Sequence, residues 1–351
     1  MRWAIFTGSA VSLRRVSYVV ERQKPAFFPM YVRNNIRWSL IWRVARVNLL
    51  IFTLYALLIC VVYGPFNFHS LAIPWQPVAT LGIAVSFYLG FKNNGSYERF
   101  WEGRKLWGGV VNTSRTWAVQ VLEFITSRVD APDVEAPAAS AQELSERHRR
   151  LVYRHIAWCN ALRIQLRRQP EQWDIAVAPF LEAAEGERMR QYGNPATHLV
   201  RQQAADLRLL REERGLLNDF QHVSMMRSLE ELYNLQGGCE RIKNTPFPRQ
   251  YAFFSYVFVW LFAGLLPLGL IGEFAQMGPD HIWLTVPFSV LVSWVFNTIE
   301  IVGHTSENPF DNQVNDVPMT ALCRSIEIDL REMLGETNLP PRIEPHNDVL
   351  Y

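Results

Sequence analysis

The sequence predicts an all-α membrane protein with four transmembrane helices and a large helical region outside the membrane. Four long stretches contain no charged residue: 47–63, 71–91, 251–272 and 282–299. A helix of roughly 20 residues crosses the roughly 30 Å hydrocarbon core of a bilayer, and the two shorter stretches reach that length with their flanks. The chain of 351 residues is 49% hydrophobic, and the segments between the stretches have helical apolar spacing without strand-like alternation.

The composition excludes several other classes of protein. A formal net charge of +2 is too small for a protein whose main partner is a nucleic acid. The cysteines lie far apart, without CxxC or Cys/His ligand spacing, at Cys60, Cys159, Cys239 and Cys323. The sequence therefore predicts neither a metal site nor a disulfide framework.

The basic residues predict how the chain is oriented in the membrane. Before residue 47 there are nine Lys and Arg residues against one acid, Glu21. The connections 64–70 and 273–281 contain no Lys or Arg. Because basic loops stay on the cytoplasmic side, we expect both termini in the cytoplasm and a multi-pass protein of the cell membrane, which is the inner membrane in a Gram-negative source.

This topology divides the chain into five parts. In order, they are a cytoplasmic N-terminal segment 1–46, the first two transmembrane helices 47–101, a cytoplasmic helical region 102–250, the last two transmembrane helices 251–302, and a cytoplasmic C-terminal segment 303–351. Within the helical region, residues 130–141 (DAPDVEAPAASA) are rich in Pro, Ala and acid. That composition predicts a mobile surface loop, to which we assign no role.

Apolar residues at helical spacing predict several packed helices in the region 102–250. One stripe comprises Leu151, Ile156, Cys159, Leu162 and Leu166, and another comprises Leu207, Leu210, Leu217 and Phe220. Arg and Glu fill the other faces of both segments. Such narrow stripes need partner helices to cover them.

Catalytic motifs are absent, so the sequence does not predict an enzyme. It contains no GxxxxGK[ST], GxSxG, HExxH or GxGxxG. His148 and His155 lie seven residues apart among arginines and are typical of surface residues rather than metal ligands. Glu300 and His304, spaced i and i+4 at the end of the fourth span, are either pore-facing groups of a vestibule or a local pair at the membrane edge.

The second charge-free stretch carries the clearest functional pattern. Ile83, Phe87 and Phe91 recur at i, i+4 and i+8, which places them on one helix face. Small residues lie among them, and the polar run KNNGS follows at residues 92–96, with Asn93 and Asn94 at its centre. If several copies of this helix surround an axis, the apolar rings form a gate that can dewet and the polar run forms a hydrated mouth. Ordinary helix packing gives the same spacing, so both interpretations stay open.

Two runs resemble the bestrophin family of ion channels, in its bacterial branch. They are LGFKNNGSYERFWEGRKLW at residues 89–107 and ENPFDNQVND at residues 307–316, just after the fourth span. The similarity extends over nearly the whole chain. It implies a homopentamer around a central pore that conducts small monovalent ions passively, with no cofactor and with Ile83, Phe87 and Phe91 as the hydrophobic neck.

The sequence departs from that family at two places. Animal bestrophins bind calcium through an acidic run after NPF, whereas this run keeps only Asp311 and Asp316 at its ends, which we interpret as helix or turn caps. The family also has a second, cytoplasmic constriction after an X-Pro step. The local match at Asn194-Pro195 implies Ala196 or Leu199 for that position.

The expected function is therefore a passive channel for chloride, other anions or small cations. The ring edges and faces of Phe87 and Phe91 carry opposite partial charges, so the residues leave the sign of the permeant ion open. A membrane scaffold or sensor whose helical region binds a partner is the alternative. A membrane-embedded enzyme using Glu300 and His304 as an acid/base pair is the weakest possibility, since no nucleophile or cofactor motif accompanies them.

Overall fold

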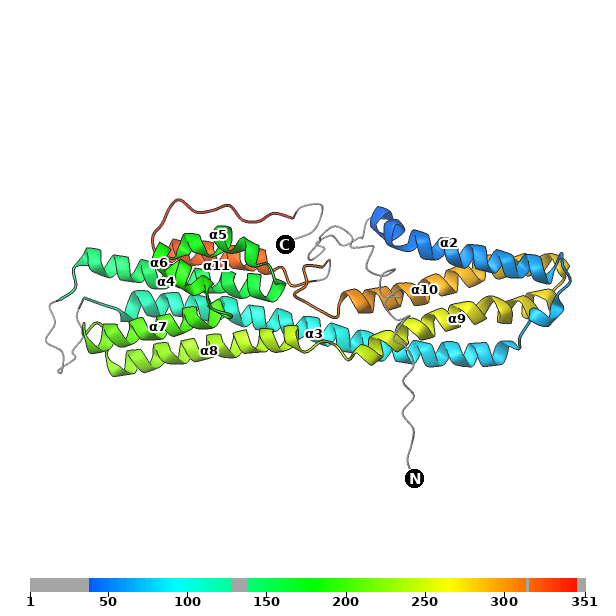
Figure 1. Ribbon diagram of the computed structural model, residues 1–351, viewed down its shortest axis with the longest axis horizontal. Helices are drawn as coiled ribbons and strands as arrows, with labels where there is room; N and C mark the ends of the chain where they lie inside the picture. Colours follow the sequence, from blue (N-terminus) through cyan, green and yellow to red (C-terminus); the bar gives the residue numbers. More distant parts are fainter. Residues whose placement is uncertain (1–37, 128–137, 314–315, 346–351) are drawn as a thin grey trace, which may run out of the picture.

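The computed structural model describes residues 38–127, 138–313 and 316–345, and every regular element within those ranges is a helix. The molecule is elongated (Figure 1). Long helices gather at one end, and helices of varied length form a second group at the other end. The predicted all-α class is thus confirmed for the described residues.

Within the described ranges, four helices are long and apolar enough to cross a membrane, as predicted. They are α2 (Trp38–Tyr63), the first part of α3 (Trp75–Phe124), α9 (Arg249–Gln276) and α10 (Thr285–Thr305). Two short 3₁₀ helices, His69–Leu71 and Pro279–Leu284, make the tight connections between neighbouring spans. We call these four helices the membrane bundle.

Helix α3 joins the two ends of the molecule. Its 50 residues extend over about 75 Å at 1.5 Å per residue, more than twice the hydrocarbon thickness. No break separates the part that follows residue 101 from the part before it. The pore-lining candidate therefore continues, as one rigid element, far into the second helix group (Figure 1).

The second group, which we call the distal region, packs around the far half of α3. It contains α4 (Ala141–Arg167), α5 (Trp173–Ala176), α6 (Ala183–Arg190), α7 (Pro195–Glu212), α8 (Asp219–Asn244) and α11 (Met319–Met333). Short 3₁₀ helices at Pro170–Gln172 and Ala178–Phe180 flank α5. Helix α8 runs alongside α3 and leads back to the membrane bundle (Figure 1).

Polar side chains fix where the distal helices begin. The Ser140 hydroxyl accepts a hydrogen bond from the backbone N–H of Glu143 at the start of α4. Asn194 caps α7 through the N–H of Thr197, with Pro195 at the first helical position. A capping box begins α8, in which the side chain of Asn218 accepts from the N–H of Gln221 and that of Gln221 from the N–H of Asn218.

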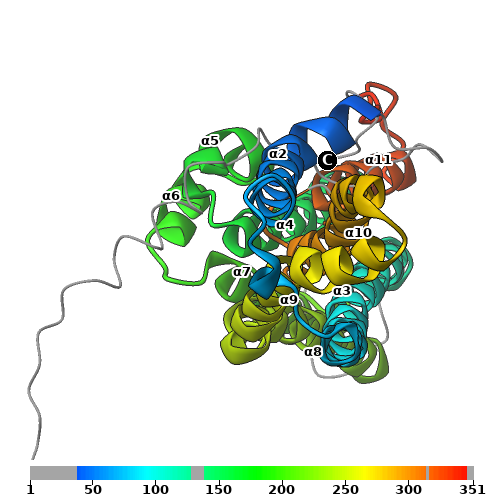
Figure 2. The ribbon, with the colours of Figure 1, turned by 90° about the vertical axis from the view of Figure 1, so that its right-hand side faces the viewer.

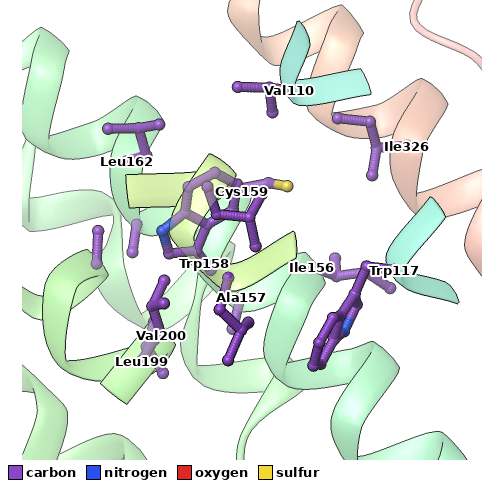
Figure 3. Packing of buried hydrophobic residues seen from close by; sticks show 14 of the residues in the cluster. Val110, Trp117, Ile156, Ala157, Trp158, Cys159, Leu162, Leu199, Val200 and Ile326 are labelled. Atoms are coloured by element: carbon purple, nitrogen blue, oxygen red, sulfur yellow. The ribbon is translucent and has the colours of Figure 1, made fainter. Parts of the chain in front are cut away.

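The largest apolar core lies in the distal region. Trp117 of α3 and Trp158 of α4 are almost fully buried within it, together with Ile326 of α11. Figure 3 shows these side chains converging from different helices, with Leu199 and Val200 of α7 in the same cluster. Close packing of this kind holds the long α3 rigidly against its partners.

A buried arginine fastens α6 and α7 to α4. Arg154 is 1% exposed and donates to the Glu185 carboxylate of α6 and, at 2.7 Å, to Asp206 of α7. Gln203 donates to the backbone oxygen of Leu151 close by. A buried charge is stable only when groups of opposite charge form hydrogen bonds to it. The network therefore fixes the positions of α6 and α7.

Most of the predicted apolar stripes are buried, but two assignments in the distal region were wrong. Phe220 was grouped with buried leucines, whereas its side chain is 89% exposed at the start of α8. His155 was taken as a surface residue, whereas it is 1% exposed and contacts the Ser114 hydroxyl at 2.8 Å. Most of the predicted loop 130–141 lies outside the described residues.

Candidate pore-lining surface

Three large apolar side chains project from one face of α3 that no other part of the described chain covers. Ile83 is 61% exposed, Phe87 is 68% exposed and Phe91 is 74% exposed. Their i, i+4 and i+8 spacing keeps them on one face over about 12 Å of helix. These are the residues that the sequence predicts for a neck, and the chain leaves them available to a shared surface.

The opposite face of the same helix segment is buried. Val85 and Leu89 are each at most 2% exposed and pack in a cluster with residues of α9. Gly82 lies beside Phe262 of α9, whose ring would be 2.8 Å from any Cβ at that position. The small residue therefore allows α9 to approach closely and orients the apolar stripe away from the bundle.

The uncovered face extends along α3 on both sides of the apolar stripe and is interrupted near Gly109, which packs against Leu235 of α8. Before the apolar stripe, the exposed residues at the same helical spacing are Gln76 and Thr80. After the stripe they are Asn94, Glu98, Trp101, Lys105, Asn112, Thr116, Val119 and Glu123. An ideal helix places all of these within a narrow sector. The face is thus mostly polar, with one apolar segment at residues 83–91.

Helix α3 lies at the edge of the membrane bundle. Viewed along the long axis, α2 and α3 are at opposite sides of the bundle, with α9 and α10 between them (Figure 2). Both α9 and α10 pack against α3. The uncovered face of α3 is therefore on the periphery of the single chain, where a second copy can contribute to a common cavity.

A buried ionic cluster lies on the covered side of α3, directly after the apolar stripe. Lys92 is 1% exposed, and its Nζ is 3.0 Å from Glu300 Oε1 of α10 and 3.5 Å from Glu307 Oε1. His304 Nδ1 lies 3.6 Å from the same Glu307 oxygen. The cluster connects the inner end of the stripe to α10 and to the segment that follows α10.

The structure changes the roles predicted for Glu300 and His304. They do not pair with each other, because Glu300 binds Lys92 while His304 faces Glu307. Glu300 is only 7% exposed, so it does not face an open vestibule, whereas the His304 side chain is 62% exposed. Sequence reasoning missed Lys92 and Glu307 as partners, although a lysine at a membrane edge is itself a signal for a buried counter-charge.

The polar run after the stripe is divided between two faces. Asn94 is exposed on the uncovered face, and its amide donates to Glu98 at 2.9 Å. Asn93 instead points toward α10 and donates to the backbone oxygen of Ile299. Gly303 permits this contact, since a Cβ there would collide with the Asn93 side chain. Only Asn94 of the two therefore fits a pore mouth.

The two sequence runs that carried the family resemblance meet in space. Arg99 donates to the backbone oxygens of Glu307, Ile242 and Thr245 at 2.9 to 3.0 Å. Phe310 is 1% exposed and packs on Gly103 of α3, where a Cβ would be 3.1 Å from its ring. The NPF segment is therefore a docking element that holds the end of α10 against α3 and α8.

The predicted constriction at Ala196 and Leu199 is not supported. Both residues are 0% exposed and belong to the distal core. Figure 3 shows Leu199 beside Trp158 and Ala157, inside the chain rather than on its surface. Asn194-Pro195 marks the start of α7. The apolar side chains that follow it are buried because α7 packs against α4.

The run after NPF contains ionic contacts but no metal-ligand cluster within the described residues. Asp311 forms an ion pair with Lys243 of α8, so it joins two segments rather than capping a turn. Asp316 is 1% exposed, and burial raises its pKa to about 7 although the backbone groups of Gln313 and Asn312 act to lower it; its role as a turn cap stays a prediction. No group of three or more His, Cys, Asp or Glu residues in the described ranges is arranged to hold a metal ion.

Comparison with known proteins identifies one family. Residues 19–332 match the model of the bacterial and fungal bestrophin protein family. The matched segment includes all four membrane helices and nearly the whole distal region.

Curated relatives carry channel names. The chain is 32% identical over 269 residues to the voltage-dependent anion channel-forming protein YneE of Escherichia coli K12, which covers 77% of this chain and 80% of that protein. It is 31% identical over 328 residues to the voltage-dependent anion channel-forming protein RSc3414 of Ralstonia nicotianae, covering 88% and 96% of the two chains.

Solved structures have the same fold. A bacterial bestrophin homolog from Klebsiella pneumoniae superposes with a TM-score of 0.71 at 29% identity, covering 82% of this chain and 98% of that one. A membrane protein described as variant G264A superposes with a TM-score of 0.73 at 29% identity, covering 84% and 100%.

Proposed function

The chain belongs to the bacterial and fungal bestrophin family, and from this premise we propose that it is a passive channel for small monovalent ions, with a pore shared by five identical subunits. The observation that carries the proposal is the uncovered face of α3, apolar at Ile83, Phe87 and Phe91 and polar on both sides. A face of this kind is unfavourable in an isolated chain and favourable around a water-filled axis.

In the proposed assembly, five α3 helices surround the axis and turn these three residues inward. Each position then forms a ring of five apolar side chains, which makes a neck about 12 Å long. Water inside such a neck lacks polar partners, so the neck empties and fills with small changes in radius. The polar stretches at Thr80 and Asn94 keep the two mouths hydrated.

We propose Phe220 in place of Ala196 and Leu199 as the apolar side chain of a second constriction. The support is its 89% exposure and its position one turn before Ser224, which accepts a hydrogen bond from Gln120 near the far end of α3. Because the uncovered face of α3 continues past Gln120 to Glu123, Phe220 lies close to the far end of the proposed pore.

The orientation proposed from the basic residues places the distal region in the cytoplasm, in a cell membrane that is the inner membrane of a Gram-negative source. The nine basic residues before residue 47 support this topology. The anion-channel names of the relatives support anions, with chloride as the simplest, as the permeant species. We propose no catalytic role, because passive permeation of an ion needs no reaction to be catalysed.

Reconstitution of the purified protein in planar bilayers tests this function. When the KCl concentrations on the two sides of the bilayer differ, a conducting pore gives a current. The sign of its reversal potential shows whether chloride or potassium is the more permeant ion. We expect the reversal potential of the current to lie close to the equilibrium potential of chloride. A value close to that of potassium would contradict anion selectivity while supporting conduction.

A scaffold or sensor protein would give no flux in the same bilayers. No contact in the described residues favours that alternative, and the uncovered face of α3 has no evident purpose in it. An absence of current from a correctly assembled oligomer would therefore contradict the channel assignment. Mass measurement of the oligomer in the same preparation gives the required control on assembly.

A further inference from the structure

An apolar groove runs along the membrane bundle between α2 and α10. It has a volume of about 460 Å³, within the range of small-molecule and lipid-sized sites. The side chains that shape it include Trp42, Ala45 and Leu49 from α2 and Val290, Leu291 and Trp294 from α10. The two helices diverge toward the start of α2 (Figure 1).

We propose that this groove binds one acyl chain of an anionic phospholipid, whose headgroup is held by Arg46. This arginine is exposed and lies near the start of α2, one residue after the groove residue Ala45. Arg46 is one helical turn after Trp42 and therefore on the same side of α2. Exposed arginines at a membrane surface attract anionic lipids.

The dimensions of the groove suit one leaflet of a bilayer. From Ile41 to Thr53 it follows α2 for about 18 Å, slightly more than half of the roughly 30 Å hydrocarbon core. One end of the groove lies near the start of α2, where Trp42 is 63% exposed, as is typical of an aromatic side chain at headgroup depth. A chain entering from the headgroup region thus ends near the middle of the membrane.

The chemistry of the lining also favours a hydrocarbon chain. The hydroxyl of Thr53, a polar side chain in the groove, donates to its own backbone at Leu49 and so offers no free donor. The indole Nε1 of Trp294 is buried and has no hydrogen-bond acceptor in the described residues. The lining therefore presents mainly hydrocarbon to an occupant of the groove.

The position of the groove favours lipid over a second subunit. Figure 2 shows α2 on the side of the bundle away from α3, with α9 and α10 between them. If α3 faces the shared axis, the groove faces the surrounding membrane. This inference rests on the membrane placement of α2 and α10 and on the side assigned to the axis, and it does not require that the assembly conducts.

Native mass spectrometry of the purified, full-length protein tests the proposal. Phosphatidylglycerol and phosphatidylcholine are added separately to the detergent-solubilised protein, and the lipid retained per chain is counted. We expect wild-type protein to retain phosphatidylglycerol about tenfold more strongly than phosphatidylcholine, which corresponds to roughly 1.4 kcal/mol. Retention is measured without any current, so the outcome is separate from that of the conduction experiment.

Two variants distinguish the groove from general lipid contact. Leu291→Trp fills the groove from an exposed position and should reduce retention of both lipids about tenfold. Val44→Trp adds the same bulk on the exposed face of α2, outside the groove, and should retain lipid as the wild type does. Equal retention by these two variants would overturn the proposal.

The headgroup contact is tested by Arg46→Gln. This variant should retain phosphatidylcholine as the wild type does. Its retention of phosphatidylglycerol should fall about tenfold, so that the preference for the anionic lipid disappears. The matched control is Arg208→Gln, which removes one exposed charge from the distal region. An unchanged preference in the first variant, or an equal loss in the second, would overturn the assignment. Size-exclusion profiles and thermal unfolding of all variants verify that they remain folded.

Discussion

Lys92 Nζ and Glu300 Oε1 are 3.0 Å apart, although 208 residues separate them in the chain. Both groups are buried, and Glu307 Oε1 completes the cluster at 3.5 Å from the same nitrogen. Lys92 directly follows Phe91, the last residue of the apolar stripe. The stripe is therefore anchored at its inner end by charges on the opposite face of the helix.

Replacing Lys92 by Met should lower the free energy of unfolding by about 3 to 5 kcal/mol, because it leaves two carboxylates buried without their cation. The double variant Lys92→Met/Glu300→Met should recover part of that loss. Arg115→Met is the control, since the Arg115 side chain is 50% exposed in its pair with Asp329 and should cost at most about 1 kcal/mol. Denaturant unfolding followed by circular dichroism measures all three, and equal losses for Lys92 and Arg115 would contradict the buried cluster.

Replacing Ile83, Phe87 and Phe91 together by Ala should raise single-channel conductance severalfold and weaken any gating. The wider and less apolar neck stays hydrated, and the loss of assembly should be modest. The control is Ala at Leu50, Leu54 and Leu58, which have the same spacing on the exposed face of α2. Bilayer recording measures both sets. Unchanged currents from a properly assembled neck variant would remove the neck assignment.

Arg99→Lys should loosen the connection between α3, the end of α8 and the segment after α10. A lysine cannot reach the three backbone oxygens that the guanidinium binds, so a loss of about 1 to 3 kcal/mol is expected. Hydrogen exchange should increase at residues 242–250 and 306–313. Arg104→Lys, a nearby change on the same helix, serves as the comparison, and similar exchange in both variants would argue against the clamp.

Stability should fall with acidity because of His155. Burial lowers the pKa of this side chain to about 3, so the folded chain keeps it neutral while the unfolded chain protonates it below its ordinary value of 6.5. Since the unfolded state then binds more protons, stability is lost as the pH falls below about 6.5, by roughly 2 kcal/mol at about pH 5.

His155→Gln should remove that part of the pH dependence while retaining an amide that can bind the Ser114 hydroxyl. The measurement is the free energy of unfolding between about pH 7 and pH 5. His69→Gln, a change at an exposed histidine, should leave the slope of the wild type intact. A slope that is the same in wild type and His155→Gln would show that the buried imidazole does not titrate as described.

The sequence predicts the membrane spans well because charge-free length is a local property. It does not predict that α3 continues as one helix to Phe124, since the predicted boundary of the second span lies at residue 101. The polar run after Phe91 contains no proline, and Lys92 and Asn93 find partners on α10. Spacing alone places Ile83 and Phe87 on one helix face, but it does not predict that this face is uncovered, because buried helix contacts have the same spacing.

Long-range contacts explain the incorrect predictions. The partner of Glu300 is Lys92 rather than His304, because the fold brings α3 against α10 and local spacing carries no information on that contact. Ala196 follows a proline that starts α7, and only the packing of α7 on α4 decides that its side chain is buried. Phe220 has the spacing of a core residue but lies at the first turn of α8, where no neighbouring helix covers it.

Thiol accessibility tests the central claim most directly, since all four native cysteines are buried and give little background. A cysteine at Phe87 is treated with a charged, water-soluble thiol reagent during bilayer recording, and a cysteine at Leu54 on the exposed face of α2 is treated in the same way. We predict that the reagent blocks current through Phe87→Cys channels and leaves Leu54→Cys channels unchanged. Conducting Phe87→Cys channels that resist the reagent would contradict a pore lined by α3.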